Sequence, residues 1–485
     1  MEKERITSQR VVSNFIWSAM ERFGAYIVSF VVSLVLARIF ADNRGVYGTI
    51  AIVTAITAIL QVFIDSGLGT ALVQKKDADN LDFSTVFWFN LGASIILYIA
   101  VFFLSPLISS FYKGENLIWI IRVLSLTIII SACKNVLQAY VSRKLLFKKF
   151  FFATLIGTIT AAIAGIFMAL KGFGAWALVA QHLINLTVDT FVVWIMIKWK
   201  PNFKFSFSRF KTLFKYGWKI LCSRIVDVGF RQFKTFVIGF KYSDVDLALY
   251  NRGEQFPDAI STNINTAIDG VLLPTMSKSQ SDISEVKQIT RKSIKLTGYT
   301  IFPLLVILGV CAPQIIRLLL SEKWLDCVPY LQIFCFVYAF YPINTANLNA
   351  IKAIGRSGLY LILDIIVKVC SITIIIVSIQ FGVLYIALSG LLTILISRLV
   401  YSIANKLVLK YDFKEQICDI LGSFCLSLLM GAIIYGLGYL GGFSYRVMLV
   451  QILIGFTMYI GISIISKNKT FNYIVSVLKK MTKKD

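Results

Sequence analysis

The sequence contains few charged residues and almost no histidine. Asp, Glu, Lys and Arg make up 15% of the 485 residues, whereas soluble domains carry roughly 25%. There is one histidine, no two cysteines are spaced as C-x-x-C, and no G-x-x-x-x-G-K-[ST] P-loop occurs. We therefore expect no metal site, no cofactor, no P-loop-driven pumping and no enzymatic activity, although a membrane-embedded carboxylate site remains an open alternative.

Long apolar runs dominate the chain. Hydrophobic residues make up 57% of it, and runs of about 20 apolar residues, each long enough to cross a bilayer, recur from end to end. The connections, none longer than about 20 residues, are too short for a soluble domain. The sequence predicts an all-α polytopic membrane protein with about 14 transmembrane helices. We place these spans at 12–38, 46–64, 83–107, 117–140, 150–170, 174–197, 213–240, 246–274, 296–320, 328–350, 357–379, 382–405, 415–439 and 446–465.

The positive charge of the chain indicates its topology. The formal net charge is +24. With the N-terminus inside, the cytoplasmic segments hold about 31 Lys and Arg residues and the opposite segments about 7. This asymmetry predicts that both termini are cytoplasmic and that the number of spans is even. It favours contact with anionic lipid headgroups and gives no reason to expect a nucleic-acid partner.

Two parts of the chain resemble each other in order. "LARIFADNRGVYG" (36–48) resembles "IGFKYSDVDLALYN" (238–251), and "IDSGLGTALVQ" (64–74) resembles "IDGVLLPTMSK" (268–278), with Asp65 matched to Asp269. An even number of spans lies between the copies, so they have parallel orientation. We predict two six-helix pseudo-symmetric lobes around a central cavity plus two C-terminal helices. The predicted parts are an N-terminal lobe at 1–200, a C-terminal lobe at 201–410, extra helices at 411–466 and a basic cytoplasmic tail at 467–485.

Charged residues inside the predicted spans fall on three helical faces. Glu21 and Arg22 interrupt the span at 12–38. In the span at 213–240 the charges recur at i, i+3, i+7 and i+10, as Arg224, Asp227, Arg231 and Lys234. The span at 246–274 carries an acidic face of Glu254, Asp258, Asn265 and Asp269. Since a charge inside the bilayer costs roughly 2.5–3.5 kcal/mol on insertion scales, we expect the three faces to line one aqueous cavity.

Several charges also have a structural interpretation. Arg224 and Asp227 could pair with each other, and Arg252 could lie near the outer end of its span. Asp364 and Lys368 form an i, i+4 pair, and we expect them to neutralise each other. In the tail, apolar residues at helical spacing among lysines indicate an interfacial helix; they are Phe471, Ile474, Val475 and Leu478.

Seven stretches, taken together, resemble bacterial polysaccharide transporters. In chain order they are "FIWSAMERFGAYIVSFVVSLVLARIFADNRGVYG" (15–48), "DSGLGTALVQKKD" (65–77), "STVFWFNL" (84–91), "LQAYVSRKLLFKK" (137–149), "LYNRGEQFP" (249–257), "LLPTMSKSQSD" (272–282) and "SEKWLDCVPYLQIF" (321–334). To about residue 410, the chain resembles the polysaccharide-transport (oligosaccharidyl-lipid flippase) branch of the multidrug/oligosaccharidyl-lipid/polysaccharide (MOP) flippase superfamily.

The resemblance implies fourteen helices in two lobes around a central cavity, in the bacterial inner (plasma) membrane. It implies alternating-access transport of an undecaprenyl-pyrophosphate-linked oligosaccharide repeat unit from the cytoplasmic to the outer leaflet, for O-antigen, capsule or exopolysaccharide synthesis. Further expected partners are membrane lipids and polysaccharide polymerase or assembly proteins. Family members usually carry cations in the cavity, and the candidates here are Arg22, Arg224, Arg231, Lys234 and Arg252. The candidates for charge tuning or ion coupling are Glu21, Asp227, Glu254 and Asp258.

Two other functions remain open at this point. A cation-coupled small-molecule or multidrug antiporter of the same superfamily would favour an acidic or aromatic cavity, which fits the span at 246–274 but not the spans at 12–38 and 213–240. A membrane-embedded polysaccharide polymerase or ligase usually needs a sizeable external loop, which the short connections do not provide.

Overall fold

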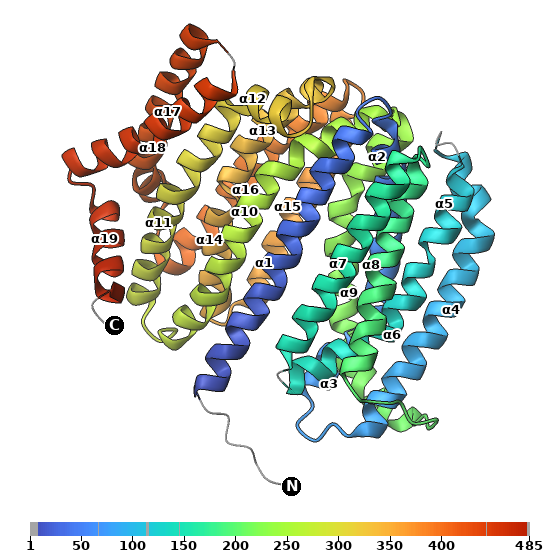
Figure 1. The fold of residues 1–485 in the computed structure, drawn as a ribbon. Helices are drawn as coiled ribbons and strands as arrows, with labels where there is room; N and C mark the ends of the chain where they lie inside the picture. The colour runs from blue at the N-terminus through green and yellow to red at the C-terminus, as the bar shows by residue number, and fades with distance from the viewer. Residues whose placement is uncertain (1–7, 66, 113–115, 145, 443, 483–485) are drawn as a thin grey trace. The chain divides into compact units, whose positions relative to one another are not determined.

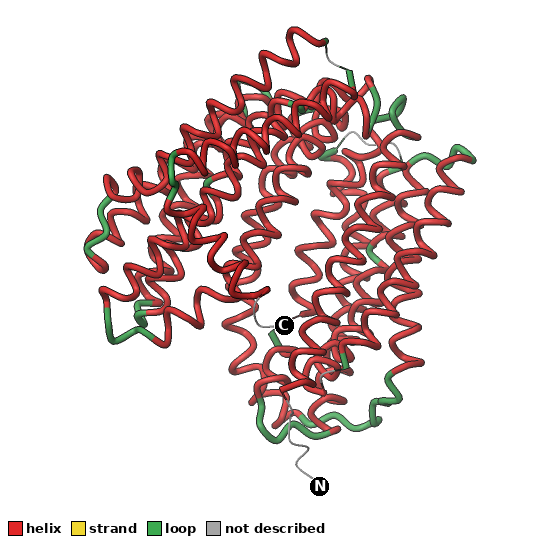
Figure 2. Tube along the Cα trace, turned by 60° about the vertical axis from the view of Figure 1, so that its left-hand side comes forward, coloured by secondary structure: helices red, strands yellow, loops and turns green. Residues whose placement is uncertain are grey.

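The computed structural model describes residues 8–65, 67–112, 116–144, 146–442 and 444–482, and these ranges contain helices and no strand (Figure 2). The side chains of residues 8–23, 216, 267, 477, 478 and 480–482 lie outside this description. Figure 1 labels the helices, whose bounds are α1 (Ser8–Ile39), α2 (Gly45–Asp65), α3 (Leu68–Gln74), α4 (Asn80–Ser110), α5 (Leu117–Leu124), α6 (Leu126–Lys144), α7 (Phe147–Leu170), α8 (Ala175–Met196), α9 (Phe207–Lys241), α10 (Asp244–Lys278), α11 (Ile283–Val310), α12 (Ala312–Leu319), the 3₁₀ helix η1 (Glu322–Cys327), α13 (Val328–Ala339), α14 (Tyr341–Ala353), α15 (Ser357–Ser378), α16 (Val383–Leu409), α17 (Phe413–Gly441), α18 (Tyr445–Ile465) and α19 (Lys469–Thr482).

Every predicted span coincides with one helix or with two consecutive helices, which confirms the all-α membrane fold. Among the described residues, 11 helical segments are long and apolar enough to cross a membrane. The three predicted spans outside this set are those with charged stripes. For α1 the described apolar part is shorter, at Gly24–Ile39, while α9 and α10 carry several charges each. The count of 14 transmembrane helices therefore stays a prediction.

The chain divides into two compact units, Met1–Ala248 and Leu249–Asp485. In the N-terminal unit α7 packs against α1 and α8, which run side by side with it in Figure 1, and α4 packs against α6. In the C-terminal unit α11 packs against α17, and α15 against α16. The predicted lobes, divided between residues 200 and 201, were inferred from sequence repetition and stay a prediction.

Two structural features recur in the two units. The fourth predicted span of each half is broken in two, α5 from α6 at Ser125 and α13 from α14 at Phe340. In each half an aspartate on the second span also accepts a hydrogen bond from an asparagine on the fourth. Asn135 Nδ2 lies 2.5 Å from Asp65 Oδ1, and Asn349 Nδ2 lies 2.6 Å from Asp269 Oδ1. Asp65 and Asp269 are the residues that the sequence comparison matched, so the structure supports an internal repeat.

Helix α9 belongs to the N-terminal unit because it packs along α2 and α3. The two helices run antiparallel, since Ile52 lies beside Gly239 while Gly67, just beyond the end of α2, lies beside Gly217. A Cβ atom on Gly239 would be 2.9 Å from Ile52 Cδ1. Gly67 has φ +66°, and a Cβ atom there would fall inside van der Waals contact of the Gly217 carbonyl oxygen. Backbone contact thus fixes the register of α9 on α2.

The segment that leads into α9 is bonded to the start of α4. Trp199 Nε1 donates to Asn80 Oδ1 at 2.6 Å, and the Asn202 backbone N–H donates to Ser84 Oγ at 2.9 Å. Arg209 Nη1 lies 2.5 Å from Asp79 Oδ1. Desolvation acts to raise the pKa of Asp79, but hydrogen bonds from the Asp82 backbone and from Arg209 hold it below its usual value. These contacts hold the beginning of α9 on the N-terminal unit.

The C-terminal helix α19 packs against its own unit. Phe471 and Ile474 contact a buried cluster that includes Tyr299 and Tyr459, and the rings of Tyr299 and Phe471 lie 6.5 Å apart. At least these two of the four predicted apolar tail residues therefore contact protein, and the interfacial position of the helix stays a prediction.

We predict that Gly67→Ala lowers the stability of the protein. Alanine at a positive φ costs about 1–3 kcal/mol, and its Cβ atom would also push Gly217 of α9 away from the start of α3. The measurement is the midpoint of thermal unfolding of the purified protein in detergent.

The matched control is Gly69→Ala, because Gly69 lies in α3 and a Cβ atom there would meet nothing within 4 Å. This variant should melt at the wild-type temperature or slightly above it. Equal melting of the two variants would contradict the backbone contact between Gly67 and Gly217.

Candidate functional site

The candidate site is the charged stripe of α9, and we describe it within the N-terminal unit. Arg224 is the central residue of the helix, with 17 residues before it and 17 after it. At 100° per residue, Asp227, Arg231 and Lys234 all fall within about 80° of Arg224 around the helix axis. Arg224, Asp227 and Arg231 are exposed, and Lys234 is half-buried. The helix therefore presents three cations and one carboxylate on one accessible face.

Arg224 contacts an acid on a neighbouring helix. Its Nη1 atom lies 3.4 Å from Asp65 Oδ2, and the two side chains are 49% and 34% exposed. A pair this long and this accessible is weak, worth at most about 1 kcal/mol. The sequence left Arg224 open as a cation of the cavity or as a partner of Asp227. The structure gives it an acidic partner on α2, which is Asp65.

Arg231 and Lys234 differ from Arg224 in this respect. Neither forms an ion pair or a hydrogen bond within the part of the chain that the structure describes. A cation without a counter-ion inside a membrane protein is costly unless it faces water or an anionic ligand. These two side chains are accordingly the strongest candidates for binding an anion.

The acidic residues of α10 are bonded within the C-terminal unit. Glu254 accepts a hydrogen bond from Tyr338 Oη at 2.9 Å, and Ser261 Oγ donates to the Tyr338 carbonyl oxygen at 2.8 Å. Asp258 accepts from Thr262 Oγ1, one turn further along the same helix, at 2.8 Å. Both carboxylates are half-buried. Tyr338 thus joins α10 to α13 on the face that the sequence predicted to be acidic.

Arg252 is the one predicted cation in the C-terminal unit, and it is buried. Its side chain is 4% exposed, and Nη1 donates to Gln255 Oε1 at 2.6 Å. The guanidinium lies 5.6 Å from the centre of the Trp324 ring, a cation–π geometry. These contacts favour a structural role for Arg252.

Glu21 and Arg22 lie on α1, but their side chains are outside the described residues. Their place in the cavity stays a prediction.

Two ion pairs show what the sequence could and could not find. Asp364 Oδ2 and Lys368 Nζ are 2.7 Å apart, which confirms the predicted i, i+4 pair. Sequence reasoning missed the buried pair between Lys134 on α6 and Asp189 on α8, whose side chains are 16% and 3% exposed. These residues are 55 positions apart and no local pattern links them.

Sequence reasoning also missed Asp65 and Asn135 as neighbours of the cationic face. The signal for Asp65 was present in the repeat, where it matches Asp269. No pattern in the sequence pointed to Asn135. Among the described residues, no group of three or more His, Cys, Asp or Glu side chains could hold a metal ion.

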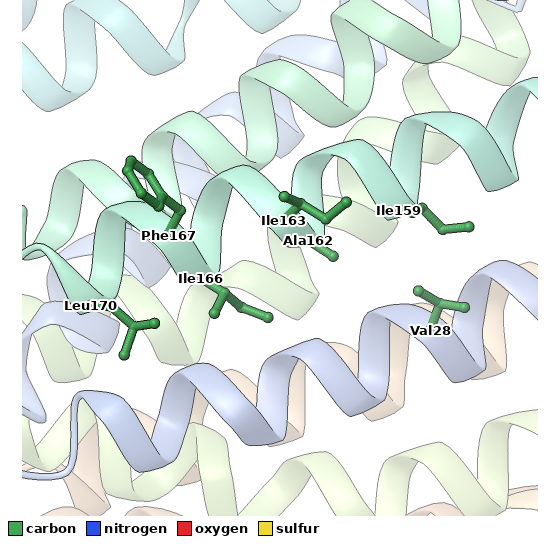
Figure 3. Close-up of a pocket in the computed structure, with 7 residues that line it drawn as sticks. All are labelled: Val28, Ile159, Ala162, Ile163, Ile166, Phe167 and Leu170. Atoms are coloured by element: carbon green, nitrogen blue, oxygen red, sulfur yellow. The ribbon is translucent and has the colours of Figure 1, made fainter.

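A groove of about 450 Å³ lies between α1 and α7 (Figure 3). Val28 faces α7 across it, and the other lining residues come from α7: Ile159, Ala162, Ile163, Ile166, Phe167 and Leu170. With an entirely apolar side-chain lining, the groove has no group that could bind a charged headgroup. The cationic stripe of the N-terminal unit lies on α9.

Comparison with known sequences places the chain near polysaccharide biosynthesis proteins. A family model described as "Polysaccharide biosynthesis protein" matches residues 35–329. The teichuronic acid biosynthesis protein TuaB of Bacillus subtilis (strain 168) is 24% identical over 393 residues, covering 78% of this chain and 79% of that protein. The lipopolysaccharide biosynthesis protein WzxC of Escherichia coli (strain K12) is 24% identical and covers 89% and 88%. The succinoglycan biosynthesis transport protein ExoT of Rhizobium meliloti (strain 1021) is 22% identical and covers 73% and 71%.

Solved structures share the fold. The lipid II flippase MurJ in an inward closed conformation aligns with a TM-score of 0.77 and 19% identity, covering 93% of this chain and 99% of that one. An inward-facing multidrug resistance transporter of the MATE family, from the MOP superfamily, aligns with a TM-score of 0.60 and 15% identity, covering 78% and 96%. At these identities the likeness establishes the architecture alone.

We predict that a thiol at position 231 is accessible and one at position 252 is not. In a variant lacking the native cysteines, Arg231→Cys should react rapidly with a water-soluble maleimide, because the Arg231 side chain is exposed and lies on a polar face. Arg252→Cys should react only after unfolding, because Arg252 is 4% exposed. Mass spectrometry of the labelled protein gives both rates. Slow labelling at position 231 would mean that it faces lipid, and would contradict the site.

Proposed function

The chain belongs to the polysaccharide biosynthesis protein family, and from this premise we propose that it is a flippase for lipid-linked oligosaccharides. It moves an undecaprenyl-pyrophosphate-linked repeat unit from the cytoplasmic to the outer leaflet of the bacterial inner membrane, with both termini in the cytoplasm. The polymer made from the units is a surface polysaccharide. Membrane lipids surround the protein, and polysaccharide polymerase or assembly proteins receive the product.

One observation carries the proposal: the cationic face of α9, where Arg231 and Lys234 have no counter-ion among the described residues. A pyrophosphate group cannot enter hydrocarbon unaided, because desolvating its charge is prohibitively costly. A guanidinium is a planar fork of five N–H donors that matches phosphate oxygens, and an ammonium adds a compact charge. The face therefore offers the headgroup a replacement for its hydration shell, while the polyprenyl tail stays in lipid.

The remaining candidates complete the proposed mechanism. Arg22 adds a further cation to a central cavity, and the two lobes rock between inward-open and outward-open states around it. Glu21, Asp227, Glu254 and Asp258 tune the charge of the cavity or take a coupling ion. Because Arg252 is buried against Trp324, we assign it to stabilising the C-terminal unit, and not to contact with the pyrophosphate.

The cationic face also separates this proposal from an antiporter of cationic drugs. A cavity for a cationic substrate would be lined by free carboxylates. Glu254 and Asp258 already accept hydrogen bonds, and three of the four charges on the α9 stripe are cations. An anionic headgroup is the better match for this arrangement.

We predict that Arg231→Ala and Lys234→Ala each reduce transport of a lipid-linked oligosaccharide. Each removes a charge-assisted contact worth about 1.5–3 kcal/mol, so uptake at low substrate should fall about 10- to 100-fold, and further in the double variant. The assay reconstitutes the protein in vesicles and follows how much substrate becomes accessible to an enzyme on the opposite side. In cells, loss of the protein should cause lipid-linked repeat units to accumulate.

The control is Lys171→Ala, which removes an exposed cation just after α7, away from α9. It should transport at the wild-type rate. Transport by the Arg231 and Lys234 variants at the rate of this control would refute the proposed role of the α9 face.

A further inference from the structure

Asp65 makes a short hydrogen bond with Asn135 and a long, weak ion pair with Arg224. Its Oδ1 atom accepts from Asn135 Nδ2 at 2.5 Å, while its Oδ2 atom is 3.4 Å from Arg224 Nη1. Asn135 is on α6, so the first contact ties the carboxylate to the body of the N-terminal unit. The second reaches the midpoint of the cationic helix. The aspartate is therefore held in place on one side, and on the other side it holds an arginine loosely.

The matching residue in the C-terminal unit has only the first of these contacts. Asp269 accepts from Asn349 Nδ2 at 2.6 Å, and no cation pairs with it in the described part of the chain. The aspartate–asparagine bond is thus common to both units and serves to join two helices. The contact with arginine occurs only where the helix with the cationic stripe passes.

The backbone around this contact is fixed, so the Arg224 side chain can change partner while α9 stays in place. Gly67, two residues after Asp65, meets the backbone of α9 at Gly217. Near the other end of α9, Gly239 packs on Ile52 of α2. Between these two contacts, Arg224 is 49% exposed and uses one of its five N–H donors on Asp65. The other donors remain available to a second anion.

We propose that Asp65 is a positioning residue that holds Arg224 when the site is empty, gives it up to a phosphate of the substrate, and reclaims it when the substrate leaves. The inference rests on the proposed function, since it takes a pyrophosphate as the ligand. A dianionic phosphate can engage the guanidinium through two parallel bonds, whereas the half-buried Asp65 carboxylate holds it through one long contact. Asp65 thereby competes with the substrate and limits how tightly it binds.

The competition predicts opposite effects on affinity and on turnover. In Asp65→Asn the carboxylate charge is lost while the side-chain oxygen can still accept from Asn135. The variant should bind inorganic pyrophosphate about two- to five-fold more tightly than the wild type, as measured by isothermal titration in detergent. In vesicles its KM should fall by a similar factor and its turnover should also fall, because release of the substrate is no longer assisted. Asp65→Glu, which restores the charge, should recover turnover.

Two controls separate this role from a structural one. Asp269→Asn makes the same change to the same kind of aspartate–asparagine bond where no arginine is in contact, and it should leave pyrophosphate affinity unchanged. In an Arg224→Ala background, Asp65→Asn should no longer tighten binding, because the effect acts through that arginine. Thermal unfolding of Asp65→Asn and Asp269→Asn shows whether the two substitutions affect the fold equally.

The outcomes also separate the inference from the proposed function. Pyrophosphate binding that is equal or weaker in Asp65→Asn than in the wild type overturns the inference alone. Tighter binding that persists in the Arg224→Ala background overturns it as well. A wild-type protein that neither binds pyrophosphate nor transports lipid-linked oligosaccharide overturns the proposed function, and this inference with it.

Discussion

The cost of placing a charge in hydrocarbon governs the arrangement of this protein. Each charged group inside a span must be paired, face water or meet a ligand. Lys134 with Asp189, and Asp364 with Lys368, satisfy the requirement by pairing. Arg231 and Lys234 do not pair with any described residue; Arg231 is exposed and Lys234 is half-buried. The same constraint that explains the paired charges makes these two the strongest candidates for contact with water or an anionic ligand.

The fold supplies what a site of this kind needs, which is a rigid support beneath flexible side chains. Helix α9 is held at its beginning by hydrogen bonds from Trp199 and Arg209 to residues at the start of α4. It is held along α2 by close backbone packing at Gly67. Helix packing in a membrane relies on such close approach and on interhelical hydrogen bonds, because lipid gives no hydrophobic driving force between helices. Long cationic side chains can then move without displacing the helix that carries them.

Much of the architecture could be predicted because hydropathy is read directly from the sequence. All predicted spans are helical, and the family resemblance was confirmed by the match over residues 35–329. The break before α14 also had a signal, since Pro342 lies in the first turn of that helix. The break at Ser125 had none, because it falls within an apolar run whose sequence is compatible with a continuous helix.

The site was predicted less completely, because partners across helices leave no local pattern. The stripe of α9 was visible at helical spacing, but its acidic neighbour Asp65 is 159 positions away from Arg224. Helical spacing also does not distinguish the accessible Arg231 from the buried Arg252.

Contact between backbones at Gly67 and Gly217 has a consequence for how such proteins diversify. Helix α9 is aligned by main-chain atoms, so the residues that set its register are different from the charged residues of its stripe. Substitutions at turn intervals along the stripe can change its charge one position at a time, while the glycines keep the scaffold constant. Under the proposed function, related proteins can thereby hold a pyrophosphate more or less tightly without redesigning the packing of the helix.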